Sequence, residues 1–274
     1  MKGGNTVQSN ALWRWLFRRG KRQKLTVLSA FFAGYVLLLS GMFAYFHSKD
    51  AVANRFSAQG GSVTLLEPDW DYEGQDLAKI SEPGMQIKKN PYGFNNGQVD
   101  LYIRLKLTIT LDGYTPRNDT YETSFPDDAD GRARRLKSIA EAIRLNDGTP
   151  LLTLDTTGNV SSWTAACSNT DFQIEPANAS GSDDSLVFYF YYTGSSGTVP
   201  NDNMAVVQPQ QGTTELFRRV DIPVLKKDWL GVFDQRYTIT MAAEAIPTVN
   251  YPVLPVQNNG TDPYAISVFG EEFS

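Results

Sequence analysis

The chain has 274 residues, of which 41% are hydrophobic and 20% charged, enough for one domain of fair size with its own core. The net charge is -5, but basic residues crowd the first 24 positions and no acidic residue occurs before Asp50. The remainder is therefore acidic, which argues against nucleic acid as a partner of the main domain.

An uncharged apolar run follows the basic cluster, from Leu25 to Phe46. At about 1.5 Å per residue, a helix of this length would just cross a hydrocarbon core of roughly 30 Å. The run also fits a signal peptide, because Leu25–Leu39 has the length of an h-region and Ala44 offers a small residue for cleavage. A cleaved signal and a permanent anchor both remain open. In either case the basic flank stays in the cytoplasm and the chain after Phe46 is exported.

Two parts are therefore expected: a signal peptide or signal anchor over residues 1–44, and an exported domain over 45–274. The first part comprises a basic region, 1–24, and an apolar export helix, 25–44. The second part has mostly the period-two alternation of strands, at 62–70, 98–111 and 235–246. Aromatic residues at 185–194, between loops rich in Gly and Ser, predict a central strand. The strand at 98–111 would place one apolar row on a single face: Val99, Leu101, Ile103, Leu105, Leu107, Ile109 and Leu111.

One segment, about 127–148, has apolar residues at helical spacing and ends at Gly148. It predicts an amphipathic helix on or beside a sheet. The tail from Pro247 is rich in Pro and Asn and is expected to be extended. The economical architecture is mainly β: one antiparallel β-sandwich with a helical insertion at about 112–220.

Residues suited to catalysis are scarce. His47 is the one histidine and Cys167 the one cysteine, so no usual zinc site can form. A Ser-His-Asp triad is possible only if His47 serves as its base. No internal disulfide is possible; Cys167 either pairs between chains or is a buried bystander. The sequence therefore predicts no catalytic residue, no metal site and no cofactor.

Two other groups of side chains have alternative interpretations. The acidic stretch 67–76 could bind calcium through its carboxylates or could be a solvated loop after a strand. Its acidic residues are Glu67, Asp69, Asp71, Glu73 and Asp76. The tryptophans could be platforms for a carbohydrate or core residues; the candidates are Trp70, Trp163 and Trp229.

Several short motifs occur in a defined order. After the apolar run come "AYF" and an Asn-x-Phe element at Asn54 and Phe56, with Gly60 or Gly61 close behind. "EAI" at 244–246 occurs late, followed by Pro247. A longer element between them comprises Pro83, Gly84, Lys89, Pro91, Asn95 and Gly97. Across residues 25–111 and 237–246, this order resembles the TasA/camelysin-type proteins of Gram-positive bacteria, including BsaA-like biofilm-matrix proteins, although Pro247 replaces the polar residue usual in that family.

The resemblance implies export by a signal peptide that a SipW-type signal peptidase cuts, here between Ala44 and Tyr45. It also implies a jelly-roll-like sandwich that polymerises into extracellular fibres, in which the freed N-terminus of one subunit adds as a strand to the next. By that analogy Tyr45, Phe46, Val52 and Phe56 are the donor-strand candidates. Alternatively, the segment is the first strand of its own domain.

Three functions follow from these expectations. The first is a structural, fibre-forming protein of the cell surface or biofilm matrix, with itself or related matrix subunits as partners. The second is an accessory or cap subunit held in the membrane through residues 25–46. The third is a surface β-sandwich that binds a carbohydrate or another ligand. A peptidase, a label attached to camelysin-like proteins, is not supported, because one histidine beside the processing point provides no ligand set for an activated water.

Overall fold

The computed structural model describes residues 54–55, 61–79, 84–114, 128–174, 184–194, 201–222, 235–260 and 263–273. The chain divides into two compact units, Met1–Phe43 and Ala44–Ser274, and every described residue belongs to the second. The expected export segment and cleavage point therefore lie outside the described residues. Among the helices that are described, none is long and apolar enough to span a membrane.

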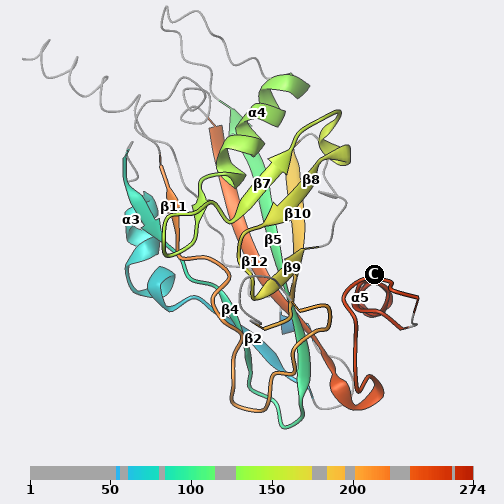
Figure 1. The fold of residues 1–274 in the computed structure, drawn as a ribbon. Helices are drawn as coiled ribbons and strands as arrows, with labels where there is room; N and C mark the ends of the chain where they lie inside the picture. Colours follow the sequence, from blue (N-terminus) through green and yellow to red (C-terminus); the bar gives the residue numbers. More distant parts are fainter. Residues whose placement is uncertain are drawn as a thin grey trace, which may run out of the picture. The chain divides into compact units, whose positions relative to one another are not determined.

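The described part is mainly β, with antiparallel sheets and a few helices (Figure 1). The strands are β1 (Asn54–Arg55), β2 (Val63–Leu66), β3 (Gln86–Lys88), β4 (Tyr92–Asn95), β5 (Leu101–Tyr114), β6 (Ile143–Arg144), β7 (Leu152–Asp155), β8 (Thr164–Cys167), β9 (Phe172–Ile174), β10 (Ser185–Tyr192), β11 (Arg219–Asp221) and β12 (Gln235–Pro247). The helical elements are η1 (Trp70–Gly74), α3 (Gln75–Lys79), α4 (Ala129–Ala140), η2 (Val160–Ser162), η4 (Thr248–Asn250) and α5 (Ala265–Glu272).

The largest sheet has five strands in the order β1-β12-β5-β10-β9. Its neighbours are antiparallel except for β1, which runs parallel to β12. The alternation predicted for β5 is confirmed, since its odd-numbered residues from Leu101 to Leu111 are all buried. The aromatic strand predicted at 185–194 is β10, which lies between β5 and β9 as a central strand should.

Three smaller sheets complete the same core: β3-β11-β6, β2-β4 and β7-β8. Ile87, Ile143 and Val220, one from each strand of the first of them, are fully buried together with the inner residues of β5 and β12. The apolar side chains of the small sheets therefore pack in one cluster with the inner face of the large sheet.

The predicted helix is confirmed as α4, and Leu136 and Ile139 on its apolar face are fully buried. It begins after Asp128, whose carboxylate accepts a hydrogen bond from the Gly131 N–H at 2.8 Å. It ends earlier than predicted, because Ile143 enters strand β6 and pairs with β11. The stretch expected as an insertion, about 112–220, supplies β10 and β11 and is thus part of the core.

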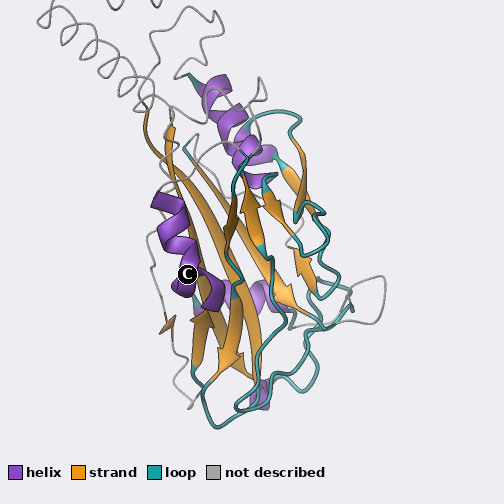
Figure 2. Ribbon diagram, turned by 90° about the vertical axis from the view of Figure 1, so that its left-hand side faces the viewer, coloured by secondary structure: helices purple, strands orange, loops and turns teal. Residues whose placement is uncertain are grey.

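The prediction of an extended tail is wrong for residues 265–272, which form α5 (Figure 2). The physical reason is tertiary packing. Val268 and Phe269 of α5 lie in a second apolar cluster with Tyr102, Tyr191 and Ile246, which alternate with the inner residues of their strands and so face the opposite side of the large sheet.

Candidate functional site

The edge of the large sheet at β12 is the feature best placed for function. Strand β12 has 13 residues and pairs with β5 from Gln235 to Pro247. On its other side β1 pairs over two residues, Asn54 opposite Ala243 and Arg55 opposite Glu244. No other described strand pairs with that side of β12. A strand near the margin of a sheet can serve as a template for an added strand.

Next to β1, the outer face of the sheet carries a buried ion pair between Arg104 of β5 and Glu244 of β12, each 4% exposed. Nε and Nη2 of Arg104 both contact Oε2 of Glu244, each at 2.6 Å. Nη1 donates to the Tyr191 hydroxyl at 3.0 Å, and Nη2 donates to the Phe269 carbonyl at 3.4 Å. The rings of Tyr189 and Phe269 face the guanidinium at 4.4 and 4.7 Å. Helix α5 thus covers this charged pair.

A second buried ion pair involves Lys89, which belongs to the element at residues 83–97 of the sequence. Lys89 is 1% exposed, and its Nζ contacts both carboxylate oxygens of Glu67, at 2.7 and 2.8 Å. The same ammonium lies 4.5 Å from the centroid of the buried Trp70 ring. Lys89 therefore fixes the turn after β2 against the segment after β3.

Other residues of that motif also hold the backbone in place. Gly84 has a φ of +90°, a conformation that glycine adopts without strain, and its N–H donates to the Ile222 carbonyl at 2.6 Å. The carbonyl of Pro91 accepts from the Leu216 N–H at 2.9 Å. The Asn95 amide donates to two carbonyls, those of Val99 and Val207, and its oxygen accepts from the Gly97 N–H at 3.0 Å. In this fold the motif positions strands and turns.

The acidic stretch 67–76 is neither an open loop nor a gathering of carboxylates. It forms η1 and α3, and its acids have separate basic partners: Glu67 contacts Lys89, and Glu73 contacts Lys88 at 2.8 Å. The hydrogen bond to Glu73 raises the pKa of Lys88. Within the part of the chain that the structure describes, no three His, Cys, Asp or Glu side chains are grouped to hold a metal ion. The geometry therefore offers no support for a calcium site here.

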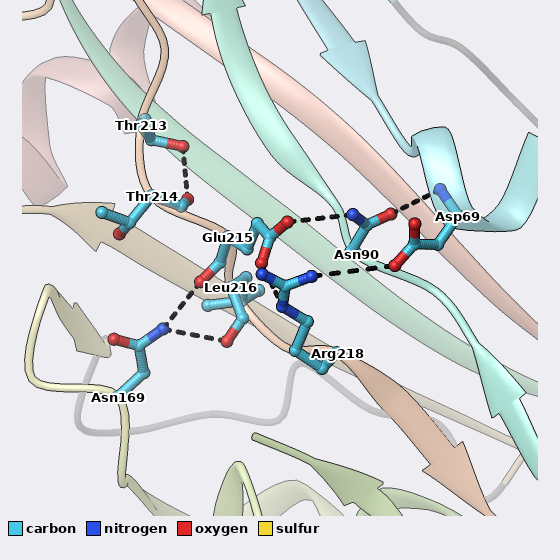
Figure 3. A network of polar contacts seen from close by, with 8 residues as sticks. All are labelled: Asp69, Asn90, Asn169, Thr213, Thr214, Glu215, Leu216 and Arg218. Atoms are coloured by element: carbon cyan, nitrogen blue, oxygen red, sulfur yellow. Dashed lines mark hydrogen bonds and ion pairs between the residues drawn. The ribbon is translucent and has the colours of Figure 1, made fainter. Parts of the chain in front are cut away.

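A polar network joins this stretch to distant segments (Figure 3). The Asn90 amide accepts from the Asp69 N–H at 2.8 Å and donates to Glu215 at 2.9 Å. Arg218 pairs with both Glu215 and Asp69. The Asn169 amide donates to the Glu215 carbonyl at 3.0 Å. These groups satisfy one another's hydrogen-bonding capacity, so the network links the segments structurally. Its partners are far apart in sequence, and no local pattern indicates it.

The tryptophans and the cysteine do not form an exposed site. Trp70 and Trp163 are 1% and 4% exposed, so neither indole offers a platform for a sugar. Burial raises the pKa of the Cys167 thiol to about 12, which makes it a poor nucleophile. Its Sγ donates to the Asn169 carbonyl at 3.6 Å. Trp229 and His47 lie outside the described residues.

The predicted cleavage and donor residues all lie outside the described residues: Ala44, Tyr45, Phe46, Val52 and Phe56. Of the motif residues, Pro83 lies outside as well, and the backbone of Asn54 belongs to β1. No protein-family model matches the chain, and no curated protein matches it. The relationship to TasA/camelysin-type proteins therefore stays a prediction.

Proposed function

We propose that this is an exported structural protein of the bacterial cell surface or biofilm matrix, and that its subunits assemble by adding the N-terminal strand of one to the β12 edge of the next. One observation carries the proposal: β1, which follows the donor segment, pairs in parallel with β12, and the same pairing made with a second copy would join two subunits. The partner is a second copy or a related matrix subunit. A jelly-roll arrangement, which the resemblance implies, is part of the proposal.

The register of β1 gives the proposed added strand a defined length. In a parallel pair positions advance together, so the pairing of Asn54 with Ala243 places Val52 opposite Met241 and Phe46 opposite Gln235. Tyr45, the first residue after the expected cut, then falls one position before β12 begins. A strand freed by cleavage after Ala44 would therefore match the length of β12.

The same register assigns faces to the donor candidates. Met241, Ala243 and Ala245 belong to the core. Cross-strand partners project on one face of a sheet, so Val52 and Phe56, opposite Met241 and Ala245, would point into the acceptor's core. Burial of each large apolar side chain contributes about 1.5–3 kcal/mol. The alternation of the donor segment thus suits the edge that it would cover.

Signal cleavage has a direct role in this proposal. Before the cut, residues 25–44 would hold the donor segment at the membrane. Cleavage between Ala44 and Tyr45 by a SipW-type peptidase would release it at the cell surface. A chain that keeps its signal would instead be the membrane-anchored accessory or cap subunit, which accepts a strand without donating one. N-terminal sequencing of the native surface protein distinguishes the two.

The test is assembly of the mature chain, residues 45–274, followed by sedimentation and electron microscopy. We expect fibres above a critical concentration, and none from a chain that begins at Asn54 and so lacks only residues 45–53. Phe46→Asp should raise the critical concentration, because it places a charge on the core face. His47→Asp is the matched control on the opposite face. A mature chain that stays monomeric at every concentration would refute the proposal.

A further inference from the structure

We propose that Asn259 is a site of spontaneous deamidation, at which the side-chain amide is converted to a carboxyl group, and that the equivalent Asn96 is protected by the fold. The inference is independent of the proposed function. It rests on two copies of one three-residue sequence, Asn-Asn-Gly, at 95–97 and 258–260. These copies contain the two Asn-Gly dipeptides of the chain.

The two copies have the same local hydrogen bond. The Gly97 N–H donates to Oδ1 of Asn95 at 3.0 Å. The Gly260 N–H donates to Oδ1 of Asn258 at 2.9 Å. In each copy the first Asn thus accepts from the backbone two residues further on, which is the pattern of an Asx-turn. Because sequence and local geometry are matched, a difference in reactivity between the copies must come from their surroundings.

The reaction open to an Asn-Gly dipeptide is ring closure by the backbone. The Gly260 nitrogen gives its proton to water or hydroxide and attacks Cγ of Asn259. An N–Cγ bond forms and the Cγ–Nδ2 bond breaks, and the leaving nitrogen takes up a proton to depart as ammonia. One water molecule then opens the cyclic imide at either carbonyl and leaves aspartate or isoaspartate. Water is the co-reactant, nothing is oxidised or reduced, and glycine favours the attack because it has no Cβ beside the nitrogen.

The surroundings of Asn259 leave room for this attack. Residues 257–260 are all exposed. Gly260 has a φ of +91°, a conformation that glycine adopts without strain, and a Cβ placed on it would meet no atom within 4 Å. Solvent can therefore reach the attacking nitrogen, and the ring can form without pushing aside packed groups on that side.

The surroundings of Asn96 oppose the same reaction. Gly97 is buried, and its N–H has a further acceptor in the Ser62 carbonyl at 3.2 Å. The side-chain nitrogen of Asn96 donates to the Thr64 hydroxyl at 2.9 Å. Both reacting groups are thus held against the segment that leads into β2. Ring closure at Asn96 must break these contacts first, so it requires local opening of the fold.

The modified position lies between two fixed points of the chain. Before it, the Val256 N–H donates to the Asp202 carbonyl at 2.9 Å; after it, the Ala265 N–H at the start of α5 donates to the Pro255 carbonyl at 2.7 Å. Isoaspartate would add a methylene group to the main chain between these points. Either product adds one negative charge to the net charge of -5. The modified fraction would therefore increase with the age of the protein.

The first test follows both positions in one sample. The mature chain is kept at pH 8 and 37 °C, and peptide mapping by mass spectrometry measures conversion of amide to carboxyl at each Asn. We expect Asn96 to react at least about tenfold more slowly than Asn259, the factor that an opening free energy of about 1.4 kcal/mol would give. In urea the two rates should become similar, because both copies then have the same sequence and no fold. Equal rates in the native protein, a faster reaction at Asn96, or a native Asn259 that reacts only in urea would overturn the inference.

The second test separates the charged product by ion exchange and uses a matched pair of variants. The parent chain should accumulate an acidic form with time at pH 8. Asn259→Ser should abolish this form, whereas Asn96→Ser, at the equivalent position of the other copy, should leave its rate unchanged. Gly260→Ala should slow its appearance, because a methyl group beside the nitrogen hinders the attack. An acidic form that persists in Asn259→Ser, or that disappears in Asn96→Ser, would refute the assignment.

Discussion

The two buried ion pairs, Lys89–Glu67 and Arg104–Glu244, differ in how their charged groups meet. Each lies against aromatic rings. Lys89 contacts both oxygens of its carboxylate, whereas both contacts of Arg104 fall on one oxygen. A buried ion pair is stabilising only when its remaining hydrogen-bonding capacity is met. Arg104 uses its remaining donors on the Tyr191 hydroxyl and the Phe269 carbonyl, so the second pair depends on α5, whereas the first depends on the contact between Lys89 and Glu67.

The largest expected effect comes from breaking the Lys89–Glu67 ion pair. Lys89→Met should lower the free energy of unfolding by about 3–5 kcal/mol, because it leaves Glu67 buried without its counter-charge. Urea denaturation of the mature chain measures this. The neighbouring Lys88→Met is the matched control: its pair with Glu73 is 54% and 38% exposed, and it should cost less than about 1 kcal/mol. Equal losses of unfolding free energy for the two variants would show that burial does not make the Lys89–Glu67 pair more important than the exposed one.

Removing the aromatic side chain that covers the Arg104–Glu244 pair should have a somewhat smaller effect. Phe269→Ala should cost about 3 kcal/mol, at the lower end for a buried phenylalanine, because a helix near the chain end can move to fill the space. It should also admit water to Arg104. Phe273→Ala, at a partly exposed position, serves as the control in the same urea experiment. A loss below about 1 kcal/mol would mean that α5 does not cover the pair tightly.

Thiol labelling at Cys167 distinguishes the two regions without measuring global stability. Asn169 links this residue to Glu215 and so to the Lys89 side of the molecule. Labelling of the native protein at pH 8 should be slow, because burial raises the thiol pKa from 9.0 to about 12 and the thiolate is the reactive form. Lys89→Met should accelerate labelling, and Phe269→Ala should not. Equal acceleration in both variants would show that the two regions loosen together.

The same thiol gives a pH dependence with a definite sign. A raised pKa means that the folded state favours the neutral thiol. Its contribution to stability is therefore complete below pH 9.0 and declines as the pH rises toward 12. Cys167→Ser, compared with the parent chain in urea at pH 8 and pH 10, should lose less stability over this interval. An identical decline in both chains would contradict the assignment.

The smallest effect is expected at Asp155, far from both pairs. The Thr157 hydroxyl and N–H donate to its carboxylate at 2.6 and 3.1 Å and lower its pKa. A lowered pKa stabilises the fold above the ordinary value of 3.8, and this contribution is lost as the pH falls through the lowered value. An NMR titration should place its midpoint below 3.8 and show a rise after Thr157→Ala. A midpoint unchanged by that substitution would contradict the assigned cause.

Much of the fold could be predicted because its patterns are local. Period-two alternation located β5 and β12, aromatic enrichment located β10, and helical spacing located α4. Helix α5 could not be predicted, since Pro and Asn dominate the tail around it. Val268 and Phe269 are buried through contact with Tyr102, which is distant in sequence. Tertiary packing therefore determines the structure of this helix, which composition alone predicts wrongly.

The candidate site was harder to find in the sequence for a related reason. Arg104 and Glu244 occupy outward positions of their strands, where alternation predicts exposure to solvent. Their burial arises from α5, which the composition of the tail does not indicate. One signal was present: Glu244 is a lone acid within the apolar run "MAAEAI". An isolated charge in such a run needs a partner, and here the partner is 140 residues away.

The parallel direction of β1 has a mechanical consequence for the proposed fibre. When neighbouring subunits are drawn apart along the direction of paired strands, the hydrogen bonds between those strands are loaded in shear. They share the force and must rupture together, whereas a strand peeled from its end loses them one at a time. On the acceptor side, β12 passes the load to β5 over its whole length. A matrix joined in this way would resist tension along its filaments far better than lateral peeling.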